Sequence, residues 1–391
     1  MQKKPQALIT EAMPMPDDVE QPRAQAGAVL GMLKGKKAPE GGKKKGAGTE
    51  GSRRIKKDKK KEEGDATNKT NMTPAPPQAH PVVQEWVLRA LDTGVDKLRE
   101  EFRFLAKYTR NDMTQKDFNA NQSPDFNITK NRYQDVPCQD QCIVKLDPPS
   151  PSTYIHANFV ACPNSEKRFI CCQGPMEHTV EEFWWMIVQN KVEEIVMLCK
   201  TIETGKLKCA QYWPASLNEK KEFKTGLVVE NIGTKPMLRD NEIQVTSLTV
   251  SYDGKTVPVR HLHWTDWPDR GVPPCKLTGL ELLSSVRGSK FPIVVHCSAG
   301  IGRTGTIVAI EYILEKIQEN KQCPPMPDLV KGIRDQRAYS IQNDLQYLYI
   351  HRVMLNYFLE KYKDKYASLL TPENVAKYEK FVKDYNAVVG Q

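Results

Sequence analysis

The chain has 391 residues, 39% of them hydrophobic, with 57 lysine and arginine residues against 48 aspartate and glutamate residues. No apolar run reaches the roughly 20 residues that a membrane-spanning helix needs, and Glu311 interrupts the best candidate. These values exclude a membrane-spanning helix and a wholly disordered chain, and they leave enough apolar residues for a full core.

The positive charge is concentrated in residues 1–80, which hold 17 lysines and arginines against 10 aspartates and glutamates and no aromatic residue. Because the segment has little apolar surface to offset the entropy of ordering, we expect a disordered basic tail. Its lysine and arginine clusters are typical of solvated linkers, import signals and patches for nucleic acids or anionic membranes. Without aromatic residues for base stacking, we expect no specific nucleic-acid binding. Contact with import receptors or anionic surfaces would then depend on charge alone.

Ten cysteines without regular spacing are typical of a reducing compartment. Residues 1–5 show neither the apolar core of a secretory signal nor a glycine for myristoylation. We therefore expect a cytoplasmic protein, with the nucleus as an alternative destination. We expect no metal and no cofactor.

Residues 81–391 are expected to form one α/β catalytic domain that includes a C-terminal helix. Apolar spacing predicts a first helix over residues 82–108. Further predicted elements are short strands around residues 144–146, 169–171 and 194–198 and a helix over residues 179–190 capped by Thr179.

Two later segments have clear signals of their own. Residues 242–252 and 257–264 alternate in polarity, as strands do, and Asp253-Gly254 between them favours a hairpin. Pro372 opens a last amphipathic helix. We expect the apolar side of that helix to pack on the domain.

The most informative stretch is residues 293–314. Its apolar start, residues 293–295, predicts a buried strand, residues 306–314 predict a helix, and the glycine-rich segment HCSAGIGRTG lies between them. Such a turn directs backbone N–H groups at one point on the positive end of the helix dipole, which suits a phosphate dianion and stabilises a thiolate at Cys297. Arg303 adds a planar guanidinium that can hold two phosphate oxygens. This combination indicates a cysteine-dependent phosphatase.

HCSAGIGRTG resembles the phosphate-binding loop of the protein tyrosine phosphatases. Other blocks resemble further family motifs in family order: residues 130–133 (the recognition loop), 169–175, 208–214, 264–273 (the acid loop) and 334–346 (the glutamine loop). The resemblance covers residues 86–362 and implies a phosphotyrosine-specific, non-receptor-like enzyme with a single catalytic domain. It also implies a strongly twisted mixed β-sheet flanked by α-helices, with the catalytic loop between a central strand and a helix.

The reaction of that family defines the roles that the resemblance implies. Cys297 would attack phosphorus and form a phosphocysteine, Arg303 would clamp the phosphate, and Asp269 would act as general acid and then as base. An acid is needed because the leaving phenolate has a conjugate acid with a pKa near ~10. The other implied catalytic residues are Gln342, which positions the water, Thr304, which donates to the sulfur, and His296, which orders the loop.

The resemblance also implies groups that bind phosphotyrosine-containing proteins. The substrate-binding residues are Tyr133, Asp135, Ser298, Ala299, Gly300, Ile301, Gly302 and Gln346, and the supporting residues are Glu203, Lys208, Trp267 and Pro268. Glu203 would pair with the loop arginine, and Lys208 would lie near the acid loop. The alternative is that these two are ordinary surface charges.

Four positions depart from the family pattern. His156 replaces an asparagine that braces the recognition loop, Tyr339 replaces a small residue near the mouth of the cleft, Arg270 follows the acid, and Asn343 replaces a threonine. Two classes of function therefore remain: an active phosphotyrosine hydrolase, which we favour because no catalytic group is lost, and a phosphotyrosine-binding module or weak enzyme in which Tyr339 and His156 reduce turnover.

Overall fold

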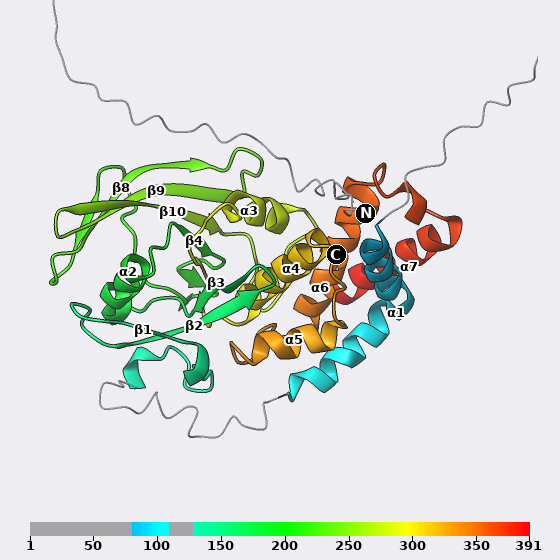
Figure 1. Cartoon of the computed structure of the whole chain (residues 1–391), viewed down its shortest axis with the longest axis horizontal. Helices are drawn as coiled ribbons and strands as arrows, with labels where there is room; N and C mark the ends of the chain where they lie inside the picture. The colour runs from blue at the N-terminus through cyan, green and yellow to red at the C-terminus, as the bar shows by residue number, and fades with distance from the viewer. Residues whose placement is uncertain (1–79, 109–127) are drawn as a thin grey trace, which may run out of the picture. The chain divides into compact units, whose positions relative to one another are not determined.

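The buried segment Ile293–His296 forms strand β11, as the sequence predicts, at the centre of a nine-stranded mixed sheet. The structure is a computed structural model and describes residues 80–108 and 128–391. The strands follow the order β1-β2-β3-β11-β4-β10-β9-β8-β7 (Figure 1). Their bounds are β1 Ile143–Lys145, β2 Tyr154–Cys162, β3 Ser165–Cys172, β4 Glu194–Met197, β7 Lys220–Glu222, β8 Val228–Pro236, β9 Ile243–Tyr252 and β10 Lys255–Trp264.

Strand β11 is parallel to both of its neighbours, β3 and β4, and β4 is parallel to β10. All four residues of β11 are buried, as expected for a parallel strand covered on both faces. The remaining pairs in this sheet are antiparallel. The mixed sheet and the central parallel strand confirm the predicted fold class.

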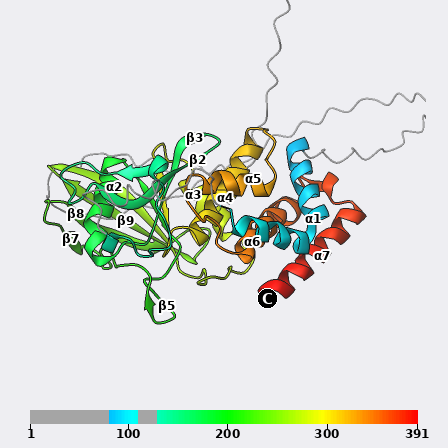
Figure 2. The same ribbon diagram turned by 90° about the horizontal axis from the view of Figure 1, so that it is seen from below.

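The predicted hairpin is confirmed by β9 and β10, which pair from Tyr252 and Lys255 onward. Asp253 and Gly254 in the turn both have positive φ, 51° and 70°, as a two-residue turn between twisted strands requires. A second, small hairpin, β5 (Ile202–Glu203) with β6 (Lys206–Leu207), is not part of the large sheet. Figure 2 shows β5 projecting away from the sheet.

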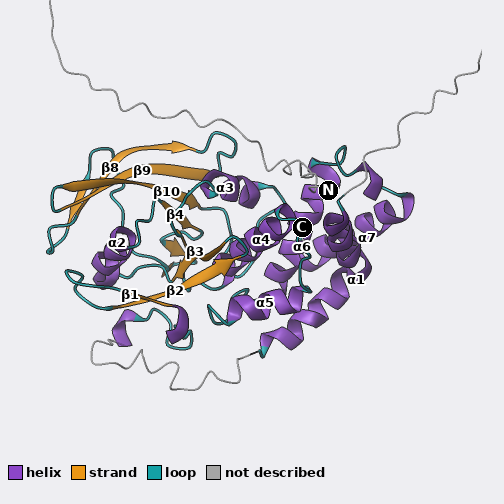
Figure 3. Ribbon diagram, viewed as in Figure 1, coloured by secondary structure: helices purple, strands orange, loops and turns teal. Residues whose placement is uncertain are grey.

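The helices lie around the sheet and in a group beside it (Figure 3). They are α1 Pro81–Ala106, α2 Val180–Gln189, α3 Thr278–Val286, α4 Gly302–Gln318, α5 Met326–Arg334, α6 Asp344–Asn356 and α7 Pro372–Val389. Within the two described ranges, no helix is both long enough and apolar enough to span a membrane.

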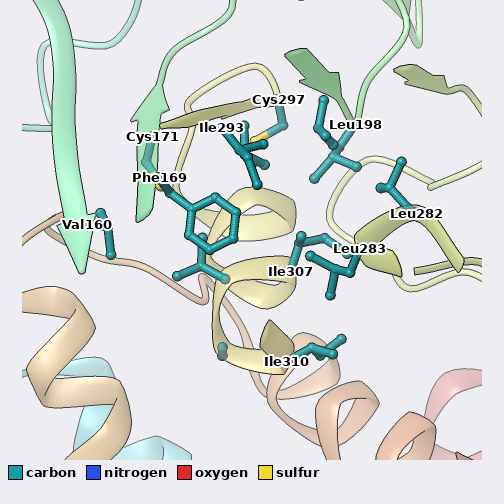
Figure 4. Close-up of a cluster of buried hydrophobic side chains, with 14 of the residues drawn as sticks. Val160, Phe169, Cys171, Leu198, Leu282, Leu283, Ile293, Cys297, Ile307 and Ile310 are labelled. Carbon is teal, nitrogen blue, oxygen red and sulfur yellow. The ribbon is translucent and has the colours of Figure 1, made fainter. Parts of the chain in front are cut away.

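Helix α4 follows the catalytic loop and packs on β2, β3 and β11. Figure 4 shows Ile307 and Ile310 of α4 below Ile293 and Phe169 of the strands, with Cys297 at the upper end of the cluster. The cluster is fully apolar apart from its cysteines, so burial of this surface fixes the helix axis under the loop.

Two predicted helices differ in detail from the expectation. Helix α1 is broken at Gly94, where φ is 68° and ψ is 169°. Thr179 precedes α2, but its side chain accepts from Met176 N–H and does not cap α2. The C-terminal helix is as predicted: Thr371 caps α7, and Phe381 and Tyr385 are buried where α7 packs against α1 and α6.

Candidate active site

Cys297 follows β11 and is only 4% exposed. Its Sγ accepts hydrogen bonds from the Gly300 N–H and from the Thr304 hydroxyl, both at 3.3 Å. Two donors therefore meet one sulfur next to the start of α4, where the helix dipole is positive. The loop therefore has the geometry that an anionic nucleophile needs.

The peptide carbonyls of residues 297–301 all accept hydrogen bonds from outside that segment. The donors are His296 Nδ1 to Cys297 (3.3 Å), Gly174 N–H to Ser298 (2.9 Å), Arg337 Nη2 to Ala299 (3.0 Å), Arg337 Nε to Gly300 (3.1 Å) and Ile341 N–H to Ile301 (3.0 Å). Because the carbonyls are turned outward and satisfied, the N–H groups of the loop are left to face an anion in front of Cys297.

Gly300 is required by the path of this loop. Its φ is +70°, and a Cβ on it would lie 2.0 Å from the Cys172 carbonyl oxygen of β3. Both the left-handed conformation and the close approach exclude any other residue.

His296 lies buried behind the loop. Its Nε2 is 2.8 Å from the Tyr212 hydroxyl, and its Nδ1 contacts the Cys297 carbonyl. Since Nδ1 donates to a carbonyl, Nε2 accepts from Tyr212. Burial lowers the pKa of His296 to about 3, so the ring is neutral and forms both hydrogen bonds in that form.

Arg303 is the loop guanidinium, and Glu203 from the β5–β6 hairpin holds it in place. The two oxygens of Glu203 accept from Nη1 at 2.6 Å and from Nη2 at 2.7 Å. Burial alone would lower the pKa of Arg303, but the hydrogen-bonded Glu203 carboxylate raises it above its usual value. Glu203 is therefore no ordinary surface charge.

Arg303 also contacts the acid loop, because its Nη1 donates to the Trp267 carbonyl at 3.0 Å. Trp267 is buried against Trp264 and Tyr349, and its indole N–H donates to the Gly271 carbonyl. These contacts hold the acid loop over the phosphate-binding loop. Pro268 is exposed at the turn.

Asp269 points into the same cleft and forms two ion pairs. Lys208 Nζ lies 2.7 Å from Oδ2, and Arg303 Nη2 lies 3.5 Å from Oδ1. Burial alone would raise the pKa of Asp269, but the hydrogen bond and charge of Lys208, followed by the charges of Arg303 and Arg270, lower it below its usual value. Without a ligand, this carboxyl is ionised at neutral pH.

The recognition loop is tied to the catalytic loop through Ser298. The Ser298 hydroxyl donates to the Lys208 carbonyl at 3.1 Å, so it accepts from the Tyr133 hydroxyl at 2.9 Å. Asp135 is exposed two residues further on. The Tyr133 ring therefore has a fixed place on the wall of the cleft.

Gln342 and Gln346 also line the cleft. Gln346 belongs to α6, and Gln342 to the segment before it. The Gln346 side-chain oxygen accepts from the Gln342 N–H at 2.9 Å. Gln346 is buried, whereas Gln342 is exposed to the cleft. This arrangement leaves the side chain of Gln342 available for a ligand or a water.

These residues surround a cavity of about 120 Å³. Its lining consists of Tyr133, Asp135, Val136, Lys208, Asp269, Arg270, Cys297, Ser298, Ala299, Gly302, Arg303, Gln342 and Gln346. The other predicted residues do not line it: His296, Gly300, Ile301, Thr304, Glu203, Trp267 and Pro268. Val136 and Arg270 line the cavity although neither was predicted as a site residue, and Arg337 supports the loop from behind.

The part of the chain that the structure describes contains no group of three or more His, Cys, Asp or Glu side chains that could hold a metal ion.

Comparison with known proteins identifies relatives that are all tyrosine-protein phosphatases. A family model described as protein-tyrosine phosphatase matches residues 127–356. Tyrosine-protein phosphatase non-receptor type 9 of Rattus norvegicus is 36% identical over 262 residues, which cover 61% of this chain and 43% of that protein. Tyrosine-protein phosphatase non-receptor type 20 of Mus musculus is 34% identical over 243 residues, which cover 61% of this chain and 56% of that protein. The chain thus spans about half of the length of these relatives.

Solved structures agree with the sequence relatives. A structure of PTPN18, described for distinct HER2 tyrosine phosphorylation sites, has a TM-score of 0.64 and 28% identity and covers 71% of this chain and 100% of that chain. PTPN18 in complex with HER2-pY1196 phosphopeptides has a TM-score of 0.62 and 27% identity, over 71% of this chain and 99% of that chain. The sequence motifs, the fold and the loop geometry all lead to the same conclusion: the chain belongs to the protein-tyrosine phosphatase family.

Proposed function

We propose that this chain hydrolyses phosphotyrosine in proteins through a phosphocysteine intermediate at Cys297. The observation that carries the proposal is the Cys297 sulfur, which accepts hydrogen bonds from Gly300 N–H and Thr304 in a cleft also lined by Arg303 and Asp269. A nucleophile, an anion-binding loop, a guanidinium and an acid are all needed for this reaction, and all lie around one cavity.

In the first step, the Cys297 thiolate attacks phosphorus and forms the S–P bond. The bond from phosphorus to the tyrosine oxygen breaks, its electron pair goes to that oxygen, and the proton of Asp269 neutralises it. Arg303 and the loop N–H groups hold the remaining phosphate oxygens throughout. The products are free tyrosine hydroxyl and phosphocysteine.

Asp269 must carry a proton for this step, although Lys208 and Arg303 lower its pKa in the free protein. A bound phosphate dianion would lie against the same cations and beside the same carboxyl. It would oppose their effect and raise the pKa of Asp269, because a nearby like charge disfavours the ionised carboxyl. Substrate binding therefore supplies the protonation state that the acid needs.

In the second step, a water oxygen attacks phosphorus and the P–S bond breaks, with its electron pair returning to the Cys297 sulfur. The ionised Asp269 accepts the proton of the water, and Gln342, which lines the same cavity, orients that water. The Thr304 hydroxyl, 3.3 Å from the sulfur, stabilises the thiolate that leaves. Inorganic phosphate is released, and the enzyme returns to its first state.

The cleft favours phosphotyrosine over phosphoserine. Cys297 is almost fully buried, so a short phosphoserine side chain would leave its phosphate far from the sulfur. The Tyr133 ring lines the wall where a substrate ring would stack, and Asp135 lies at the rim where substrate backbone amides would pass. PTPN18, a structural relative, has been solved with phosphopeptides bound.

The altered brace at His156 is the main argument for the alternative of a weak enzyme or a binding module. In the structure, His156 Nε2 lies 2.9 Å from the Val136 carbonyl, and Nδ1 accepts from Arg337 Nη2 at 3.1 Å. Burial and the charge of Arg337 lower the pKa of His156 to about 3. The neutral ring therefore connects Val136, three residues after the recognition loop, to the arginine that supports the catalytic loop, which favours the active enzyme.

Residues 1–79 lie outside the described residues, so the role of the basic segment rests on the sequence. We propose that this basic segment contacts import receptors or anionic surfaces through charge, and that the protein acts in the cytoplasm and also enters the nucleus. Imaging of the tagged chain with and without residues 1–80 tests the proposal, which fails if both forms have the same distribution.

The function is tested with the full chain and a phosphotyrosyl peptide. Cys297→Ser should abolish turnover and keep binding, because a neutral hydroxyl is a poor nucleophile. Asp269→Ala should lower kcat by about 10²- to 10⁴-fold, the usual contribution of a general acid. Arg303→Lys should weaken both binding and rate. Peptide binding by the wild type without any release of phosphate would instead favour the binding module.

The pH dependence of kcat tests the environment of Asp269. Lys208→Met removes the main cation that lowers the pKa of Asp269, so the carboxyl should keep its proton to higher pH. The alkaline limb of kcat should therefore move to higher pH. Lys206→Met, in β6 two residues before Lys208 and exposed, is the matched control and should leave the limb in place. A shift to lower pH in Lys208→Met would contradict the assignment.

Cysteine alkylation tests the nucleophile. Burial raises the pKa of Cys138 and Cys275 to about 11 and that of Cys171 and Cys323 to about 12. With its two donors, Cys297 should be alkylated first at slightly acid pH, and phosphate or vanadate should protect it. Peroxide should inactivate the enzyme, and thiols should restore it. Mass mapping that finds these four cysteines labelled and Cys297 intact would refute the prediction.

Substitutions at His156 test the brace. His156→Leu leaves the Val136 carbonyl and an Arg337 N–H without partners, so the free energy of unfolding should fall by about 1–3 kcal/mol and KM for a phosphotyrosyl peptide should rise. His156→Gln keeps a donor and an acceptor and should retain more of both properties. The exposed histidine His178, which also contacts a carbonyl, provides the control His178→Leu. Unchanged stability and KM in His156→Leu would show that the brace is not needed.

A further inference from the structure

The side chain of Asn343 connects two parts of the cleft. Its Oδ1 accepts from the Gln346 N–H at 2.9 Å and caps α6. Its Nδ2 donates to the Arg270 carbonyl of the acid loop at 2.8 Å. One amide group therefore joins the acid loop to the start of the helix that carries Gln346.

The two ends of this bridge lie next to the groups on which the second chemical step depends. Arg270 directly follows Asp269, the proposed base, and Asn343 directly follows Gln342, which would orient the water. Both Asp269 and Gln342 line the cavity. A link between their neighbours sets the separation of the base and the water-orienting amide.

The backbone of Arg270 shows why the acid loop needs such a link. Its φ is +60°, a left-handed conformation that costs a residue other than glycine roughly 1–2 kcal/mol. Arg270 is the third residue of the turn that the Gly271 N–H closes onto the Pro268 carbonyl at 3.3 Å, and its own carbonyl accepts from Asn343. The hydrogen bond from Asn343 offsets part of that strain and so favours the observed position of the loop.

We propose that Asn343 is a positioning residue that holds the acid loop over the catalytic loop and places Asp269 relative to Gln342. The inference rests on the proposed function, because it concerns both proton transfers of Asp269. In the first, the proton moves from Asp269 to the tyrosine oxygen as the O–P bond breaks. In the second, it moves from water to Asp269 as the new O–P bond forms and the P–S bond breaks.

The chemistry of the amide sets the choice of variants. A serine at position 343 can still cap α6, but its hydroxyl is too short to reach the Arg270 carbonyl while it caps. An aspartate keeps the size and the cap but places an acceptor opposite that carbonyl. An alanine removes both contacts. Serine and aspartate therefore test the bridge without removing the cap.

The experiment measures the steady-state kinetics of the full chain on a phosphotyrosyl peptide. Asn343→Ser should lower kcat about 3- to 10-fold, the range expected for one lost hydrogen bond, with KM and the melting temperature close to those of the wild type. Asn343→Asp should also lower kcat, and only Asn343→Ala should clearly lower the melting temperature. The matched control is Asn356→Ser at the far end of α6, where the amide contacts Glu360. This control should retain the kcat of the wild type.

A double-mutant cycle shows whether Asn343 acts through Asp269. In an Asp269→Ala background, Asn343→Ser should have no further effect on kcat, because the group that it positions is absent. A full additional loss in the double variant would overturn the proposal, as would a wild-type kcat in Asn343→Ser. Failure of the proposed function is distinct, since the wild type itself would then show no turnover.

Discussion

The orientation of five peptide carbonyls, those of residues 297–301, is the constraint on which the site depends. Each is turned away from Cys297 and accepts a donor from elsewhere in the fold. A buried carbonyl without a partner would cost about 1–3 kcal/mol, so the donors from Gly174, Arg337 and Ile341 fix the loop. The anion-binding face of the loop is the other side of the same peptides. Much of the domain therefore supports the site by satisfying atoms that never touch the substrate.

The elements that the sequence predicts well are those with strong local signals. Strand β11 has a short apolar run, the β9–β10 hairpin has Asp253-Gly254, and α7 has Thr371-Pro372 at its start. The break of α1 at Gly94 and the actual partner of Thr179 depend on packing between elements, so sequence periodicity does not reveal them. Strands β2 and β8 were missed because their burial arises from neighbouring strands rather than from a clear alternation of residues.

The candidate site also consists of residues that a local sequence signal predicts and residues that it does not. The segment HCSAGIGRTG predicts the geometry of the phosphate-binding loop because it holds the nucleophile, the glycines and the arginine together. The places of Asp269, Lys208 and Glu203 came only from the family resemblance. The structure brings these three together around Arg303. Residues that act through carbonyls, such as Arg337 and Asn343, carry no signal in their own identity. They are found only when the backbone groups that they satisfy are known.

The same cations set both the place and the charge of Asp269. Lys208 and Arg303 hold its two carboxylate oxygens over Cys297, and in doing so they lower its pKa. An acid held by cations is poorly protonated when the cleft is empty, but a phosphate dianion in the cleft competes for the same cations and raises the pKa again. The phenol leaves with the proton of Asp269, so the carboxylate remains, which is what a base requires. The protonation state of Asp269 thus follows the reaction: the bound dianion favours the acid form, and proton transfer to the phenol leaves the base form. No other proton carrier is needed between the two steps.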